Sequence, residues 1–316
     1  MNAISRLFAV RPTGTVGHAT LDPIDLAAGL PAGYTNITPV QTDDTQYLCA
    51  YNATTGAADL YLVADADPWL TLVESRIDLT SGPWEKLTTF TLGNELYLLT
   101  YRAEDGMFGF YHLSKDLSTS PPYLFYFSRN TPTIGFTEIA AVSSLGSQYV
   151  LGYNFSDGTV AAFSVNVTTS SSGGVPPLVA LNVWYHHWAK DWTHFAFFQL
   201  GGANFFFKIN TGKLNVNIDH LNDNPALGTV EVGSFLMPQL PDALAITNAA
   251  IIPWAHGDPY LITYIASSGA TAILRIHGDC LGWTKQAERT IIAGASLVVP
   301  YAAGKTSYVL FYGAAV

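Results

Sequence analysis

The chain has 316 residues, of which 49% are hydrophobic, 13% aromatic and only 12% charged. This composition excludes a disordered chain, a coiled coil and a charged helical bundle, because each of these classes needs far more charged residues. The formal net charge is −10 and the basic residues form no cluster, so we expect no nucleic-acid partner.

The N-terminal residues carry no recognisable targeting segment. Their apolar run, Leu7–Val10, is too short for the core of a secretory leader, and no run approaches the ~18 apolar residues of a membrane span. Localisation is therefore open between the cytoplasm and secretion after removal of a leader. Glycosylation would matter only in the second case, at the sequons that begin at Asn36, Asn52, Asn154 and Asn166.

The two cysteines, Cys49 and Cys280, lie far apart in the sequence. Two residues make neither a disulfide framework nor a metal-ligand cluster. The favoured interpretation is two buried thiols, with a bridge between them in a closed ring as the alternative.

The predicted elements begin with two short strands, about Ile4–Val10 and Thr15–Leu21. A pattern Tyr-x3-Tyr-x4-Gly then recurs along the whole chain. Its second aromatic position is occupied by Tyr51, Tyr101, Tyr153, Phe207, Tyr264 and Tyr312. Two rings four residues apart lie on one face of a strand, so these residues are predicted to pack neighbouring blades together.

A second shared site marks the start of each repeat. The starts, at residues 34, 84, 136, 192, 246 and 295, are 50, 52, 56, 54 and 49 residues apart. Each unit holds four strand-like runs; in the second unit these are Lys86–Leu92, Glu95–Tyr101, Met107–Leu113 and Tyr123–Phe127. Four strands in about 50 residues are typical of a propeller blade.

The last unit has only two strands, about Ser296–Tyr301 and Thr306–Tyr312. Together with the two N-terminal strands they complete one blade, which removes the open edges of the sheet. The fold prediction is an all-β, six-bladed β-propeller of four-stranded antiparallel blades, forming one domain over residues 1–316. The predicted blades are 34–80, 84–130, 136–188, 192–240, 246–291, and 295–316 with 1–22; seven blades with truncated ends are the alternative.

Two residues into each unit the chemistry differs from blade to blade. This position holds Asn36, Lys86, Glu138, His194, Asn248 and Leu297. If it faces the central channel, Lys86, Glu138 and His194 come from consecutive blades and form a charged arc at one mouth. Such a group binds a polar ligand or does acid–base chemistry, and an ordinary ion pair in a solvated channel is the alternative.

Residues 184–194 contain three tryptophans and three histidines. Trp188, Asp191 and Trp192 are ligand-binding candidates, because indole faces stack on sugars and planar ligands while acids supply hydrogen bonds. Burial of the tryptophans between blades is the alternative. No metal is predicted, since the adjacent His186 and His187 point to opposite faces of a strand.

Further candidates for ligand binding lie outside this segment. They are Trp84, Glu85, Asn36, Asn248, and the hairpin residues Trp254 and His256. The sequence has no nucleophile elbow, zinc-protease motif, phosphate-binding loop or dinucleotide fingerprint, and no cofactor is predicted. These missing motifs favour binding over standard hydrolysis.

The run from Trp188 through Asp191-Trp192-Thr193-His194 to Gly201-Gly202 and Gly212 resembles the repeats of lectin-like β-propellers, the tectonin and fungal fucose-lectin type. The resemblance implies sugar binding between blades, through stacked aromatic rings and polar partners. Such lectins repeat their ligand residues in every blade, whereas here the polar positions differ, which favours one site over six. No individual binding residue is therefore carried over.

Three functions follow from these patterns. The first is a lectin-like, carbohydrate-binding protein. The second is a cofactor-free enzyme at the channel mouth, acting on a small, largely apolar substrate in a cyclisation or pericyclic step of secondary metabolism, with Lys86, Glu138 and His194 orienting the substrate. The third is a protein-interaction platform. The oligomeric state and the ligand's identity cannot be read from the sequence.

Overall fold

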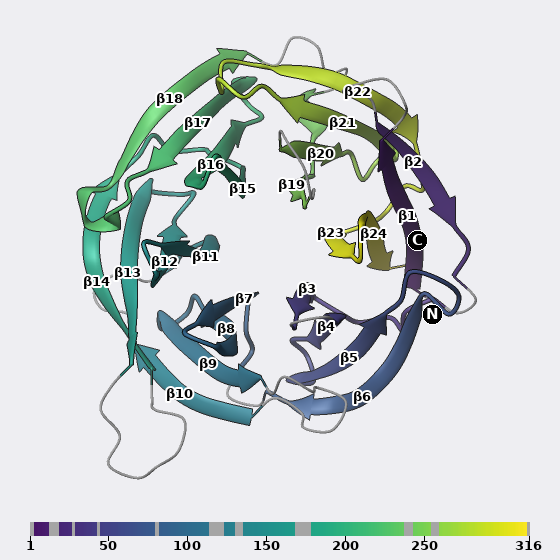
Figure 1. Ribbon diagram of the computed structural model, residues 1–316, viewed down its shortest axis with the longest axis horizontal. Coiled ribbons are helices and arrows are strands. Elements are labelled where there is room, and N and C mark those ends of the chain that lie inside the picture. The colour runs from purple at the N-terminus through teal and green to yellow at the C-terminus, as the bar shows by residue number, and fades with distance from the viewer. Residues whose placement is uncertain are drawn as a thin grey trace.

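The computed structural model is a ring of six antiparallel sheets around an open centre (Figure 1). It describes residues 3–12, 19–26, 29–42, 45–79, 82–113, 123–129, 135–167, 178–236, 243–253 and 259–314. Each sheet has four strands, and β3, β7, β11, β15, β19 and β23 are the strands nearest the centre. The predicted six-bladed β-propeller is thereby confirmed, and the seven-bladed alternative is wrong.

Five blades are made of consecutive strands. Blade 1 comprises β3 (Asn36–Gln41), β4 (Gln46–Asn52), β5 (Ala57–Val63) and β6 (Leu70–Asp78). Blade 2 comprises β7 (Lys86–Leu92), β8 (Glu95–Arg102), β9 (Met107–Leu113) and β10 (Tyr123–Arg129). Blade 3 comprises β11 (Glu138–Ser144), β12 (Ser147–Tyr153), β13 (Thr159–Val167) and β14 (Leu178–His187). Blade 4 comprises β15 (His194–Leu200), β16 (Ala203–Asn210), β17 (Asn215–Leu221) and β18 (Thr229–Leu236). Blade 5 comprises β19 (Asn248–Ile252), β20 (Tyr260–Tyr264), β21 (Ala270–Ile276) and β22 (Trp283–Thr290).

Blade 6 joins the two ends of the chain. Its strand order is β2 (Ala19–Ile24), β1 (Ala3–Pro12), β24 (Thr306–Ala314), β23 (Leu297–Ala303). β1 and β24 run antiparallel, with Ala3 opposite Ala314 and Val10 opposite Ser307. Figure 1 shows the purple N-terminal strands beside the yellow C-terminal ones. This pairing closes the ring as the sequence predicts, because it joins two half-blades whose edges would otherwise be open where the chain begins and ends.

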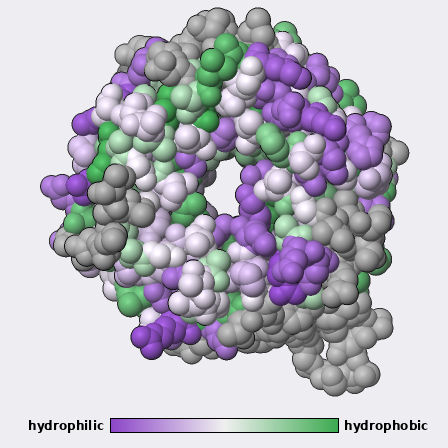
Figure 2. Space-filling model, turned by 180° about the vertical axis from the view of Figure 1, so that it is seen from behind, coloured by the Kyte–Doolittle hydropathy of each residue, from purple (hydrophilic) through white to green (hydrophobic). Residues whose placement is uncertain are grey.

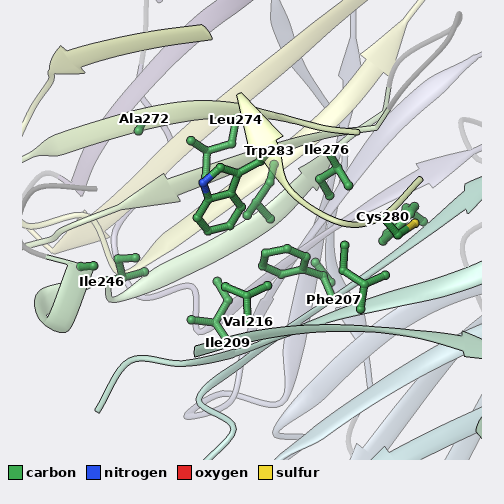
Figure 3. Close-up of a cluster of buried hydrophobic side chains, with 14 of the residues drawn as sticks. Phe207, Ile209, Val216, Ile246, Ala272, Leu274, Ile276, Cys280 and Trp283 are labelled. Carbon is green, nitrogen blue, oxygen red and sulfur yellow. The ribbon is translucent and has the colours of Figure 1, made fainter. Parts of the chain in front are cut away.

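The core lies between blades and not within a single sheet, because each sheet is covered on both faces by its neighbours. Between blades 4 and 5, Phe207 and Ile209 face Leu274 and Trp283, and all four are at most 6% exposed (Figure 3). Burial of a side chain of this size contributes roughly 1.5–3 kcal/mol, so each junction is a substantial core of its own. Cys49 and Cys280 are free thiols buried in two such cores, as expected.

Five tyrosines tie each blade to the next through their hydroxyl groups. Each hydroxyl accepts a hydrogen bond from the first backbone N–H of the following blade, in the pairs Tyr51–Trp84, Tyr101–Phe136, Tyr153–Trp192, Tyr264–Ala295 and Tyr312–Tyr34. The donor–acceptor distances run from 3.0 to 3.4 Å. The predicted inter-blade role of this repeated position is confirmed, and its chemistry is a buried hydrogen bond as well as ring packing.

Blade 4 corrects one assignment in the predicted repeat. Ile209, not Phe207, stands opposite His194 and therefore holds the tyrosine position. The following turn agrees: the residue five places later is Leu214, with φ +53°, where blades 1, 2, 3 and 5 have glycines at φ +68° to +79°. Phe207 instead packs on Trp283 of blade 5, with ring centres 5.7 Å apart.

Ile209 has no hydroxyl, so the junction from blade 4 to blade 5 is made differently. The N–H of Ile246 bonds at 3.4 Å to the carbonyl oxygen of Ala243, within the single-turn 3-10 helix η2 (Ala243–Ala245). A second such turn, η1 (Pro225–Leu227), packs against β14 of blade 3. These two turns are the helical elements of the described residues.

Candidate functional site

The innermost strands place the six variable positions at one end of the central channel. Asn36, Lys86, Glu138, His194, Asn248 and Leu297 are the first residues of β3, β7, β11, β15, β19 and β23. Hydrogen bonds connect neighbouring starts: Asn248 Nδ2, for example, donates to the carbonyl of Ser296 at 3.1 Å. We call this end the charged mouth, after Lys86, Glu138 and His194.

Lys86 and Glu138 form an ion pair at the charged mouth. Lys86 Nζ donates to Glu138 Oε1 at 2.8 Å, and the two side chains are 31% and 39% exposed. Solvent screens such a pair, so its contribution to stability is at most about 1 kcal/mol. The two charges compensate each other, and both remain accessible to a ligand in the channel.

His194 lies beside this pair, and its surroundings shift its pKa. Burial lowers the pKa of His194, while a hydrogen bond to the Thr247 backbone and the charge of Glu138 act in the opposite direction. Its Nδ1 lies 2.8 Å from Thr193 Oγ1. The imidazole is therefore neutral at pH 7 and has one nitrogen able to accept a proton.

An apolar crevice opens next to Glu138, between blades 3 and 4. Its volume is about 80 Å³. Besides Glu138, its walls are Ile139, Leu151, Gly152, Tyr153, Phe195, Ala196 and Phe197. A carboxylate at the rim of an apolar crevice suits a ligand with a small apolar group and one polar atom.

The tryptophans of residues 184–194 mostly pack against other residues of the protein. Trp188 stacks on Phe206 and Phe195, with ring centres 5.1 and 6.0 Å apart, and Trp192 is only 5% exposed. Asp191 is exposed, in a left-handed conformation with φ +71°. Trp188 and Trp192 thus join blades 3 and 4, which agrees with the structural alternative given for them.

A buried ion pair lies behind these tryptophans and is a feature that the sequence reasoning missed. Lys208 Nζ lies 2.8 Å from Asp219 Oδ2, 4.5 Å from the centre of the Trp188 ring and 5.0 Å from that of Trp192. Both charged side chains are 5% exposed. Burial lowers the pKa of Lys208 and raises that of Asp219, while each charge opposes the shift of the other. The available signal was a charged residue in mid-strand within an apolar run.

The remaining candidates lie apart from one another. Trp84 is 1% exposed, and its indole N–H donates to the Leu79 carbonyl at 3.0 Å. Glu85 is exposed and its Oε2 accepts from the N–H of Ala103 at 2.9 Å. Asn36 is half-buried at the charged mouth. Trp254 and His256 lie outside the described residues.

A larger cavity lies toward the opposite end of the channel, where the innermost strands turn into their hairpins. We call this end the hairpin mouth; its cavity has a volume of about 820 Å³. Figure 2 shows that the centre of the ring stays open with all side chains drawn. The cavity is lined by Pro39, Gln41, Gln46, Thr88, Thr89, Phe197, Phe198, Gln199, Ile251, Ile252, Pro253, Pro259, Pro300, Tyr301 and Ala302.

The lining of this cavity is uncharged throughout the part of the chain that the structure describes. It is also rich in hydrogen-bond acceptors. The amide nitrogens of Gln41 and Gln46 donate to backbone carbonyls, and that of Gln199 donates to Asn204 Oδ1. Among the described residues no group donates to the three amide oxygens, so they can accept hydrogen bonds from a ligand. The hydroxyl of Thr89 donates to a carbonyl, and the four lining prolines have no N–H.

Sequence reasoning missed this cavity because it followed the innermost strands for only three positions. The next position along each strand holds Pro39, Thr89, Ala141, Phe197, Ile251 and Pro300, and five of these six line the cavity. Two prolines at equivalent places in central strands were a usable signal. Proline removes a sheet hydrogen bond, so it is tolerated only where a strand edge is free, as it is beside a channel.

Comparison with solved structures places the fold among known propellers. The periplasmic gluconolactonase of Pseudomonas aeruginosa is 12% identical, with a TM-score of 0.52 over 91% of this chain and 83% of that one. An exo-β-1,3-galactanase of Phanerochaete chrysosporium is 11% identical, with a TM-score of 0.51 over 84% of this chain and 65% of that one. A protein of Lactobacillus plantarum is 12% identical, with a TM-score of 0.51 over 94% and 85%. At these identities the likeness establishes the β-propeller fold alone.

No protein-family model matches the chain, and no curated protein is significantly similar to it in sequence. The specific tectonin or fucose-lectin type is thus not established. In the described segments, three or more potential metal-binding side chains nowhere come together, and no helix has the length and apolarity to cross a membrane.

Proposed function

We propose that this β-propeller is a carbohydrate-binding protein, and that its ligand is a neutral sugar held in the cavity at the hairpin mouth. The single observation behind the proposal is the uncharged, acceptor-rich lining of that cavity. Sugar hydroxyls can donate hydrogen bonds to the amide oxygens of Gln41, Gln46 and Gln199. The ring of Phe197, which is half-buried and also lines the cavity, offers apolar area to the C–H face of a sugar ring.

The size and charge of the cavity support the same ligand. At about 820 Å³ it has the volume of a site for a mono- or disaccharide with its hydration water. An uncharged lining in a chain of net charge −10 gives an anionic ligand no compensating partner. The likeness to a galactanase and a gluconolactonase is consistent with sugar chemistry, but the proposal rests on the cavity.

The test is calorimetric titration of neutral mono- and disaccharides, with a matched pair of variants. Gln46 and Gln148 each donate from Nε2 to two backbone carbonyls of their own blade, but of the two only Gln46 lines the cavity. Gln148 Oε1 also accepts from the Ser143 hydroxyl, at 2.7 Å. Replacing Gln46 by Met removes one ligand hydrogen bond, so affinity should fall about three- to tenfold. Gln148→Met should leave affinity unchanged. Absence of heat with every sugar, or equal loss in both variants, refutes the proposal.

A second candidate function is an enzymatic site at the charged mouth. The observation that favours it is the apolar crevice beside the Lys86–Glu138 pair, with a neutral His194 nearby. A small, largely apolar substrate would place its apolar end in the crevice, while the pair and the imidazole polarise or deprotonate its polar end. The test is a screen of such substrates for cyclisation. For any substrate that the wild type converts, Glu138→Gln and His194→Asn should each react at least tenfold more slowly. Unchanged turnover in both variants ends this candidate.

A further inference from the structure

A further cavity, open to solvent, lies at the outer junction of blades 5 and 6, away from the channel. Its volume is about 300 Å³. Strands β1 and β2 of the closing blade form one side, and the end of β22 forms the other; Figure 1 shows β22 and β2 side by side. The lining consists of Arg6, Leu7, Phe8, Pro23, Ile24, Asp25, Arg289, Thr290, Ile291 and Ile292.

Arg289 is held in place while most of its donors stay available. One guanidinium nitrogen donates at 2.7 Å to the carbonyl of Leu21 across the junction, and the guanidinium carbon lies 5.9 Å from the centre of the Phe8 ring. A guanidinium group has five N–H donors. Within the described ranges this is the hydrogen bond that Arg289 makes, so up to four donors can reach a ligand.

Arg6 adds a second guanidinium to the same cavity. Its one hydrogen bond among the described residues is to the Ser5 carbonyl, at 3.3 Å. In the described part of the chain neither Arg6 nor Arg289 forms an ion pair. Arg11, on the same strand as Arg6, does pair with an acid, Asp22, at 3.4 Å.

The local charge of the cavity is opposite to that of the whole chain. Two arginines and one acid, Asp25, line it, whereas the chain has 24 acidic and 14 basic residues. Like charges brought together without partners repel each other, so a stable arrangement of this kind suits a bound anion. The planar fork of a guanidinium matches the two oxygens of a carboxylate or phosphate.

The floor of the cavity is apolar. Phe8, at 5% exposure, and the half-buried Ile291 belong to the apolar cluster between blades 5 and 6, and Ile292 beside them is half-buried. Leu7 and Ile24 contribute only the edge of the cavity, because their side chains pack toward blade 1 on the other face of the sheet. A bare inorganic ion would leave this floor uncovered. We propose that the cavity binds a small amphipathic anion, with a carboxylate or phosphate on the arginines and an apolar body on the floor formed by Phe8, Ile291 and Ile292.

Binding at this place would strengthen the closure of the ring. The ligand would contact β1 and β2, from the N-terminus of the chain, and β22, from another blade. Because a ligand that binds only the folded state raises its stability by mass action, the melting temperature should rise with ligand concentration.

The experiment titrates the full chain, in a phosphate-free buffer at low salt, with benzoate, phenyl phosphate, inorganic phosphate and benzyl alcohol. Calorimetry measures affinity, and thermal unfolding measures the shift in melting temperature. We expect binding of benzoate or phenyl phosphate at least tenfold tighter than that of benzyl alcohol and of inorganic phosphate. The tighter of the two anions then identifies the head group as carboxylate or phosphate.

Three variants locate the site. Arg289→Ala should weaken binding at least tenfold, and Arg6→Ala should weaken it severalfold. Arg289→Lys keeps the charge but loses the fork, and should give an intermediate affinity in a folded protein. Arg11→Ala is the control and should bind as the wild type does. Absence of binding by both aromatic anions, equal affinity for benzyl alcohol, or wild-type affinity in Arg289→Ala and Arg6→Ala overturns the proposal.

Discussion

The buried pair of Lys208 and Asp219 yields the sharpest prediction about stability. Removing one partner leaves the other charge buried at 5% exposure without compensation, which typically costs about 3–5 kcal/mol. We therefore expect Lys208→Met and Asp219→Leu each to lower the free energy of unfolding by that amount. Asp219 Oδ1 is buried and makes no hydrogen bond within the described residues, so the native pair already carries an unfavourable polar contact.

The double variant, Lys208→Met with Asp219→Leu, should behave differently. Replacing a buried pair by apolar side chains of similar volume often stabilises a protein by about 1–4 kcal/mol. Against this stands the loss of the contact between Lys208 Nζ and the rings of Trp188 and Trp192, worth about 2 kcal/mol for a desolvated cation. The two effects nearly cancel, so the double variant should lie within about 2 kcal/mol of the wild type.

Equilibrium urea denaturation of the four proteins measures this cycle, with tryptophan fluorescence as the probe. An exposed pair, Lys285 and Glu288 at 2.6 Å with 37% and 42% exposure, is the matched control. Its coupling energy should stay below about 1 kcal/mol, because water screens it. If the buried double variant is as unstable as the sum of the two single variants, the pair does not behave as a compensated unit and the reasoning is refuted.

Three further predictions concern the ring and its mouth. Burial lowers the pKa of His194 below its ordinary 6.5. As the pH falls through about 6.5, the unfolded chain therefore takes up a proton before the folded one, and the free energy of unfolding falls. His194→Asn should lose less of this free energy than the wild type between pH 7.5 and 5, and equal losses would contradict the reasoning. Tyr264→Phe leaves the buried N–H of Ala295 and the carbonyl of Ile292 without their partner and should cost about 1–3 kcal/mol in urea denaturation, whereas Tyr185→Phe, at 48% exposure, should be neutral. Gly158 and Gly93 both have positive φ, but a Cβ on Gly158 would lie 2.4 Å from the Trp188 carbonyl oxygen, while one on Gly93 would meet nothing within 4 Å. Gly93→Ala should therefore lower the free energy of unfolding by about 1–2 kcal/mol, and Gly158→Ala should lower it clearly more. Equal melting temperatures of the two variants would show that the contact with Trp188 is irrelevant.

The sequence predicts the ring because the repeated residues make the same bond in five blades. Tyr51 and its equivalents must be tyrosine wherever their hydroxyl accepts the next blade's N–H, and this leaves a visible period. At the blade 4 position, Ile209 makes no such bond, and the prediction shifted by two residues to Phe207. The repeat can be recognised in the sequence only in blades where the tyrosine hydroxyl makes its bond. The assignment therefore failed in blade 4, where Ile209 has no hydroxyl.

The contacts of the site were predictable only in part. Lys86 and Glu138 occupy equivalent positions in adjacent blades, and periodicity alone brings them together. The pairing of Lys208 with Asp219 depends instead on which faces of β16 and β17 are covered by Trp188 and Trp192, which no period encodes. The same holds for the cavity of the hairpin mouth, because lining residues such as Gln41 and Gln199 are side chains of single blades and not of the repeat.

The bonds that close this ring use almost none of the side chains at its two mouths. Adjacent blades are joined by tyrosine hydroxyls and backbone N–H groups, and the chain ends by the backbone ladder of β1 and β24. Side chains such as Gln46 and Glu138 can therefore differ from blade to blade without opening the ring. This separation lets one channel carry a charged mouth at the start of its strands and an uncharged cavity at their hairpins. It also means that variants of the mouth residues should fold, so a loss of binding in them reports on the ligand and not on the scaffold.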